Sequence, residues 1–94
     1  MRVRWLRKAL TNVDAEASYI ATEDPAATRL VVARVLEAVN RLADQPALGR
    51  PGRVHGTREL IVPKTRHIVP YRVRGETVEI LRVFHASRRL PKRW

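Results

Sequence analysis

Apolar residues in the first half of the chain recur three or four positions apart, which is the period of an α-helix. The first set, over residues 9–21, is Ala9, Val13, Ala17 and Ile20. The second set, over residues 25–43, is Ala27, Val31, Val35, Ala38 and Leu42. Each set predicts an amphipathic helix with one buried stripe. Asp24 and Pro25 are typical of a helix start, and helices joined this closely must fold back as a hairpin.

Alternating apolar and polar residues predict short strands before and after this hairpin. Proline and glycine make residues 44–53 the main loop. Gly75 and Glu76 suit a tight turn between two strands. The predicted strands are residues 3–5, 58–62, 66–74 and 77–85. The expected fold is α+β, a single domain over residues 1–94. It has a short N-terminal strand, a helix hairpin and a three-stranded antiparallel β-meander, in one sheet packed on the helices.

Pairing the last two strands directly across Gly75 and Glu76 assigns each side chain to one face of the sheet. The face expected under the helices carries Val69, Tyr71, Val73, Val78, Ile80, Arg82 and Phe84. The other face carries Ile68, Pro70, Arg72, Arg74, Thr77, Glu79, Leu81 and Val83. Its apolar strip either docks a partner or is covered by the C-terminal tail. Pro70 has no N–H to donate, so it indicates an edge, a bulge or a different register.

Charge is divided unevenly along the 94 residues. Residues 1–49 contain seven Lys and Arg against six Asp and Glu, whereas residues 50–94 contain twelve against three. The net charge of +10 therefore lies almost entirely in the strand-rich half. Such a distribution favours an acidic partner, which can be nucleic acid, a nucleic-acid machine or an acidic protein. A solvated arginine-rich surface is the alternative.

The absence of cysteine excludes disulfides, thiol nucleophiles and cysteine-ligated zinc. The three histidines, His55, His67 and His85, show no metal-ligand spacing, so neither a metal nor another cofactor is expected. No apolar run has the length of a signal peptide or of a membrane span. We therefore expect a cytoplasmic protein that contacts no membrane.

The order of these elements and the residues within them resemble the ParE/RelE superfamily of type II toxins, and its ParE-like branch most closely. The resemblance covers nearly the whole chain. The residues that carry it are Trp5, Tyr19-Ile20-Ala21, Asp24-Pro25, Leu42, Pro46, Gly49-Arg50-Pro51-Gly52-Arg53, Gly56-Thr57-Arg58-Glu59-Leu60, Ile68-Val69-Pro70-Tyr71-Arg72-Val73, Ile80-Leu81-Arg82-Val83, His85 and Arg88. The resemblance implies the fold predicted above. It also implies an acidic antitoxin, encoded alongside, that wraps and silences the toxin in a hetero-oligomer such as a 2:2 complex.

The superfamily divides into two activities. RelE-like members cleave messenger RNA on the ribosome, and ParE-like members inhibit DNA gyrase. Metal-free RNA cleavage needs a base for the 2′-OH, cations on the phosphate and an acid for the leaving oxygen. The candidates are Glu59 or His67 as base, Arg58, Arg66 and Arg82 as cations, and His85 as acid.

Two departures from the RelE-like pattern favour gyrase inhibition by direct binding, with no catalytic residue. Ile68 stands where such nucleases carry an arginine, although Arg66 lies nearby in sequence, and the tail lacks their C-terminal tyrosine. Ribosome-dependent RNA cleavage is the alternative. A non-catalytic nucleic-acid-binding module is a second alternative, which rests on the charge alone.

Two binding surfaces are predicted. The target, gyrase or the ribosome, is expected to contact Arg82, His85, Arg88 and Arg89. The antitoxin is expected to contact Ile68, Arg72, Arg74, Leu81 and Val83. Because Arg82 is predicted on the core face, its charge must reach the rim of the sheet or find an internal partner, for which Glu59 is the candidate.

Overall fold

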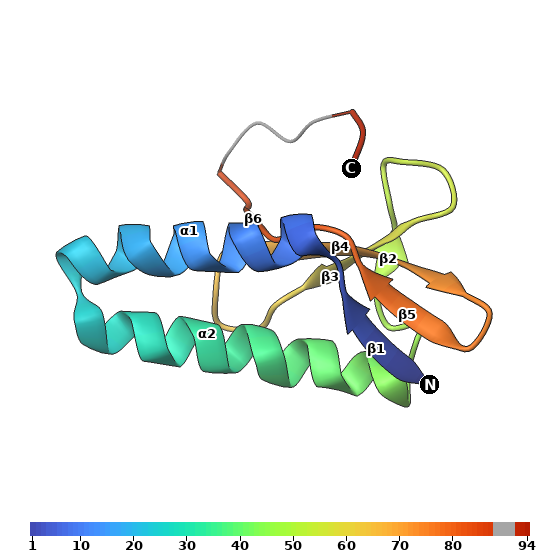
Figure 1. Ribbon diagram of the computed structural model, residues 1–94, viewed down its shortest axis with the longest axis horizontal. Coiled ribbons are helices and arrows are strands. Elements are labelled where there is room, and N and C mark those ends of the chain that lie inside the picture. Colours follow the sequence, from blue (N-terminus) through green and yellow to red (C-terminus); the bar gives the residue numbers. More distant parts are fainter. Residues whose placement is uncertain (88–91) are drawn as a thin grey trace.

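A helix hairpin lies against a single sheet (Figure 1) in this computed structural model, which describes residues 1–87 and 92–94. Helix α1 (Arg7–Glu23) runs away from the sheet. Helix α2 (Pro25–Asn40) returns toward it and continues into a 3-10 turn, η1 (Arg41–Ala43). The predicted hairpin is confirmed, and α1 extends two residues beyond the predicted range at each end.

The boundary between the two helices follows from Asp24 and Pro25, as predicted. The Asp24 carboxylate accepts hydrogen bonds from the backbone N–H groups of Ala26 (3.1 Å) and Ala27 (3.2 Å), which have no partner within the helix. Pro25 occupies the start of α2, where no N–H donor is required. Asp24 itself has extended backbone, with φ −151°, so α1 ends there.

The sheet has the strand order β1-β5-β4-β3-β2, with β6 also paired to β4. Strand β1 lies parallel to β5, and the other neighbours are antiparallel. The strands are β1 (Arg2–Trp5), β2 (Arg50–Pro51), β3 (Arg58–Ile61), β4 (His67–Arg74), β5 (Thr77–Ile80) and β6 (Phe84–His85). The predicted α+β architecture is confirmed. Strand β2 was not predicted, because it lies within the proline- and glycine-rich loop.

The core lies between the helices and the sheet face that they cover. Its buried residues are Ala9, Val35, Ala38, Val39, Leu42, Leu60, Val62, Val69, Tyr71, Val78, Ile80 and Val83. Both predicted helix stripes contribute to it, while Val13 and Val31 are partly buried against it. The connection between α1 and α2 extends beyond the sheet (Figure 1). The sheet-proximal parts of the helices therefore supply most of the fully buried contacts.

The hairpin of β4 and β5 has the predicted register near its turn, with Arg74 opposite Thr77. Beyond Pro70 the register shifts by one residue, so that Ile68 faces Phe84 rather than Val83. The Pro70 carbonyl accepts a hydrogen bond from the N–H of Leu81 (2.9 Å), but Pro70 has no N–H to return one. The ladder is broken there, which confirms the bulge or shifted register that proline indicated.

This shift overturns the predicted faces at three positions. Val83 enters the core and is only 2% exposed, whereas Arg82 and Phe84 leave the core face. The reason is the period of two along a strand, because one extra residue turns every later side chain to the opposite face. The predicted partner of Arg82 is wrong for the same reason. Its Nε donates to Asn12 Oδ1 (3.0 Å) and not to Glu59.

Candidate functional site

The sheet face away from the helices carries an array of arginines and two glutamates. Successive side chains on a strand point to opposite faces, and these residues alternate with core residues such as Leu60 and Val78. We call this surface the open face and define it by Arg4, Arg50, Arg53, Glu59, Arg72, Arg74 and Glu79.

Glu59 on β3 is the centre of the first charge cluster, and its side chain is only 3% exposed. Its Oε1 accepts from the Arg50 guanidinium (3.1 Å), and its Oε2 accepts from the backbone N–H (2.9 Å) and Nε (3.4 Å) of Arg53. Burial alone would raise the pKa of Glu59. The hydrogen bonds and positive charges of Arg53 and Arg50 outweigh burial and lower that pKa below its ordinary value.

Glu79 on β5 is the centre of the second charge cluster. Its Oε1 accepts a hydrogen bond from Arg72 Nε at 2.6 Å and lies 3.7 Å from Arg74 Nε. Arg4 stands opposite Glu79 on the neighbouring strand β1. The Arg72 hydrogen bond is the largest influence on the pKa of Glu79. Together with the charges of the three arginines it lowers this pKa, against the opposing effect of burial.

A histidine–glutamate pair is buried on the other face of the sheet, beneath α1. His67 Nε2 lies 3.3 Å from Glu16 Oε2, and both side chains are less than a tenth exposed. The His67 ring meets the His85 ring edge-on at 5.3 Å between centroids, and His85 Nδ1 is hydrogen bonded to Ser87 Oγ (2.6 Å). Arg66 completes a cavity of about 350 Å³ that these side chains line. This pair connects α1 to the end of β4.

Arg58 and Tyr71 hold the loop before β2 in place. The Tyr71 hydroxyl accepts from the N–H of Gly49 (2.8 Å) and donates to the carbonyl of Pro46 (2.7 Å). Arg58 donates to the carbonyl of Gly49 (2.8 Å). Burial raises the pKa of Tyr71, which therefore stays protonated. Only glycine fits at position 49, since a Cβ there would lie 2.6 Å from Tyr71 Cε1.

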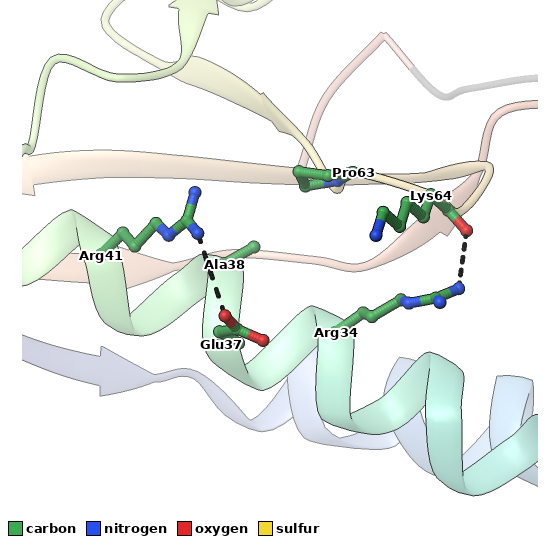
Figure 2. A pocket seen from close by; sticks show the side chains of 6 residues that line it. All are labelled: Arg34, Glu37, Ala38, Arg41, Pro63 and Lys64. Carbon is green, nitrogen blue, oxygen red and sulfur yellow. Dashed lines mark hydrogen bonds and ion pairs between the residues drawn. The ribbon is translucent and has the colours of Figure 1, made fainter.

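A basic pocket on the helix side is also structural (Figure 2). Arg34 on α2 points at the β3–β4 turn and donates to the carbonyl of Lys64 (3.1 Å), while Arg41 turns to Glu37 at 3.8 Å. Lys64 has a left-handed backbone with φ 59°, which is costly for a residue with a Cβ. The Arg34 hydrogen bond therefore secures a strained turn against the helix.

The last residue, Trp94, lies beside the sheet, where Figure 1 marks the C-terminus. Trp94 Nε1 donates to Thr57 Oγ1 (3.2 Å), and the Trp94 ring lies 5.6 Å from that of Phe84. Arg82 donates to the Trp94 carbonyl (3.3 Å) and stacks on Phe84, with 4.9 Å to the ring centroid. Trp94 thus packs beside Leu81 at the edge of a shared pocket.

The predicted antitoxin and target residues are therefore distributed differently from what the sequence indicated. Val83 belongs to the core, so its place in the predicted apolar strip is wrong, and Ile68 and Leu81 are buried, so the strip is covered rather than open. Arg72 and Arg74 do reach the surface, with 36% and 68% of their side chains exposed. The predicted target residues Arg88 and Arg89 lie outside the described residues.

The residues proposed for RNA cleavage are only partly brought together. Arg66, His67 and His85 line one cavity. Arg58 is bound to the Gly49 carbonyl and Arg82 to Asn12, at other places on the sheet. Glu59 is enclosed by its two arginines.

Sequence reasoning missed the roles of Asn12 and Arg53 altogether. Asn12 Oδ1 accepts from both Arg82 Nε (3.0 Å) and the N–H of Val83 (3.1 Å), over a separation of about seventy residues that no local pattern reports. The pairing of Arg53 with Glu59 could have been suspected from the sequence, because Glu59 lies next to buried strand residues. A buried carboxylate needs a positively charged partner close by.

The described residues contain neither a cluster of metal-ligating side chains nor a membrane-spanning helix. Within residues 1–87 and 92–94, no three His, Cys, Asp or Glu side chains gather closely enough to hold a metal ion. Over the same ranges, no helix combines the length and the apolar character that a membrane crossing requires.

Comparison with known proteins places the chain in a family. The family model described as the ParE toxin of the type II toxin-antitoxin system parDE matches residues 3–90. The chain belongs to the ParE toxin family. This toxin is 46% identical over 91 residues to the protein named "Putative toxin Y4kP" of Sinorhizobium fredii, covering 97% of this chain and 94% of that one.

Two further relatives agree with this family and with the fold. The "Toxin RelE2" of Caulobacter vibrioides is 30% identical over 87 residues, covering 93% of this toxin and 97% of that protein. A solved structure of the chromosomal ParDE toxin–antitoxin system from P. aeruginosa matches with a TM-score of 0.84 and 29% identity. It covers 93% of this toxin and 97% of its own chain. The suggested membership of the ParE/RelE superfamily is confirmed.

Proposed function

We propose that this toxin inhibits DNA gyrase by binding it directly, without breaking a bond, and that an antitoxin neutralises it. One observation carries the proposal. The side chains that RNA cleavage would need are engaged in contacts within the protein, so few are available to a substrate.

A general base is the first requirement that is poorly met. Glu59 has a lowered pKa and two arginines on its carboxylate, which makes it a weak proton acceptor. His67 is buried against Glu16, with only 4% of its side chain exposed.

Cations that stabilise the charge on the phosphate in the transition state are the second requirement. Arg58 donates to the Gly49 carbonyl, and Arg82 donates to Asn12 and to the Trp94 carbonyl. Neither of these two arginines lines the cavity that Arg66 shares with His67 and His85. These arginines act as parts of the scaffold, which fits a toxin that binds its target rather than cutting it.

A supercoiling assay with purified gyrase and relaxed plasmid tests this proposal. We expect the toxin in molar excess to block supercoiling. The double substitution Arg88→Glu and Arg89→Glu should abolish the block. Arg29→Glu on α2 with Arg41→Glu on η1 is the charge-matched control and should leave the block intact. Normal supercoiling in the presence of excess wild-type toxin would refute gyrase inhibition.

Ribosome-dependent RNA cleavage is the second candidate, and the cavity shared by Arg66, His67 and His85 is the observation in its favour. Toeprinting on translating ribosomes separates it from gyrase inhibition. New cleavages that disappear with His85→Ala, but persist with His55→Ala in an exposed loop, would support it. Their absence with the wild-type toxin would remove it.

The neutralising antitoxin is proposed to be acidic, and a 2:2 complex is the proposed assembly. Arg72 and Arg74 stay available to it, whereas Ile68 and Leu81 are buried. Pull-down with the product of the neighbouring acidic reading frame tests this. Arg74→Glu should weaken capture more than Arg29→Glu, and equal capture would exclude this placement.

A further inference from the structure

We propose that the open face binds the phosphodiester backbone of nucleic acid through its two arginine–glutamate clusters. The inference goes beyond gyrase inhibition and does not rest on it. A toxin that fails in the supercoiling assay can still bind nucleic acid, and the reverse also holds.

Each cluster has more positive charge than its glutamate can neutralise. Three arginines, Arg4, Arg72 and Arg74, surround Glu79. Arg50 and Arg53 share Glu59, and Arg66 lines the same surface pocket as these two arginines. Arg50 and Arg53 are 54% and 45% exposed, so their guanidinium groups face solvent as well as the carboxylate. Both clusters thus present unneutralised donors to an anion.

The buried glutamates also fix the arginines in position before any ligand arrives. A flexible arginine loses side-chain entropy when it binds, and a guanidinium already held by a carboxylate has less to lose. Arg72 is held at 2.6 Å and Arg50 at 3.1 Å from their glutamates. A guanidinium has five donors in a planar fork, so one carboxylate contact leaves others for a phosphate.

The spacing of the clusters suits a backbone of repeated charges. Glu59 and Glu79 are two strands apart, because Glu59 pairs with Pro70 and Glu79 with Arg72 on the strand between them. Strand spacing and residue rise put the two glutamates roughly 12 Å apart. That distance corresponds to a few successive phosphates along one strand of a duplex.

Nucleic acid needs no apolar anchor on this face, whereas a peptide such as the proposed antitoxin needs one in addition to Arg72 and Arg74. Peptide recognition needs apolar anchors in pockets as well as charge. The apolar residues at the centre of this face, Ile68, Pro70 and Leu81, are buried. Ile61 is exposed at the Glu59 end, and the other exposed residues that define the face are arginines. A surface of arginines is typical of phosphate contact.

Fluorescence anisotropy with the full-length toxin tests the proposal. The probes are short labelled oligonucleotides of equal length: a DNA duplex, a single DNA strand and an RNA strand. We expect at least one of these probes to bind, with an affinity that falls steeply as salt is added. Comparing the three affinities shows whether the face prefers duplex DNA, single-stranded DNA or RNA. Contact with about four phosphates gives a slope of log K against log salt of roughly −3 to −4 for the duplex.

Paired substitutions locate the site. Arg50→Gln with Arg53→Gln, and Arg72→Gln with Arg74→Gln, should each weaken binding roughly tenfold and reduce the salt slope by about two. Arg29→Gln with Arg41→Gln removes the same charge from α2 and η1 and should change affinity much less. Equal loss in the control pair would show that net charge alone attracts the probe, which overturns the proposal.

Chemical protection of the wild-type toxin tests the same site without any substitution, so it does not depend on whether a variant folds. Phenylglyoxal modifies accessible arginines, and bound nucleic acid should protect Arg50, Arg53, Arg72 and Arg74 while Arg29 stays reactive. Protection elsewhere, or none, contradicts the proposed site. A polyglutamate peptide that competes as well as the oligonucleotides also contradicts it, because the face would then recognise charge and not phosphate.

Discussion

The helical and strand-rich halves of the toxin use charged residues in opposite ways. On the helices, the ion pair Glu37–Arg41 spans 3.8 Å between exposed side chains, an arrangement that stabilises a helix by only a few tenths of a kcal/mol. On the sheet, Glu59 and Glu79 are buried and held at 2.6 to 3.4 Å by arginines. The helices are a scaffold built on apolar contacts, whereas the strands display ordered charge. The functional surface is therefore expected on the strand half.

The largest expected effect tests the apolar scaffold. Leu42 is completely buried where η1 meets the core, so Leu42→Ala should lower the free energy of unfolding by about 3 kcal/mol. Leu36→Ala, on the exposed side of α2, is the control and should cost well under about 1 kcal/mol. Urea denaturation followed by circular dichroism measures both. Similar losses would mean that the helices are not packed as described.

Close packing between the loop and the sheet gives the next effect. Gly49→Ala places a Cβ against the buried Tyr71 ring and should cost about 2 kcal/mol. In Gly56→Ala the new Cβ contacts no neighbour. Only the backbone φ of +80° is unfavourable for alanine, so the free energy of unfolding should fall by about 1 kcal/mol. Thermal unfolding compares the two variants. If Gly49→Ala proved the milder of the two, the contact with Tyr71 would not hold the loop.

The cap between the helices gives a smaller effect that also separates scaffold from function. Asp24→Ala removes the acceptor for two backbone N–H groups and should cost about 1 kcal/mol. Asp14→Ala, exposed within α1, should cost close to nothing. Both variants should keep wild-type oligonucleotide affinity at a temperature where they are folded. A loss of affinity with Asp24→Ala would contradict the division between the two halves.

The pH dependence of stability is expected to be the smallest effect, because the arginines are partly exposed and water screens them. A lowered pKa means that the folded state holds Glu59 and Glu79 ionised more strongly than the unfolded chain does. Their stabilisation is therefore present above the ordinary pKa of 4.5 and is lost as the pH falls through the folded value.

Urea denaturation from neutral to acidic pH measures that loss. The double variant Glu59→Gln with Glu79→Gln should show a flatter stability profile below pH 4.5, since it has lost both titrations. Glu76→Gln, in the exposed turn, is the control and should keep the wild-type profile. A double variant with an unchanged profile would show that the clusters do not couple protonation to folding.

Much of the candidate site was visible in the sequence only as charge. The excess of arginine after residue 49 predicted that a partner binds the strand-rich half of the chain. Arg72 and Arg74 were expected at the surface, where they lie. The pairing of arginines with Glu59 and Glu79 was not predicted. Cross-strand neighbours depend on register, and register is set by contacts far apart in sequence.

The sequence by itself determined the elements whose signals are local. The helix stripes, the Asp24 cap and the turn at Gly75 each depend on a few neighbouring residues and appear as predicted. Only the tertiary structure decided the shift of register after Pro70, which moved Val83 into the core and turned Arg82 toward Asn12. The physical reason is that helix period and turn chemistry act within one segment. The faces of a bulged strand are chosen by the packing of the whole sheet against the helices.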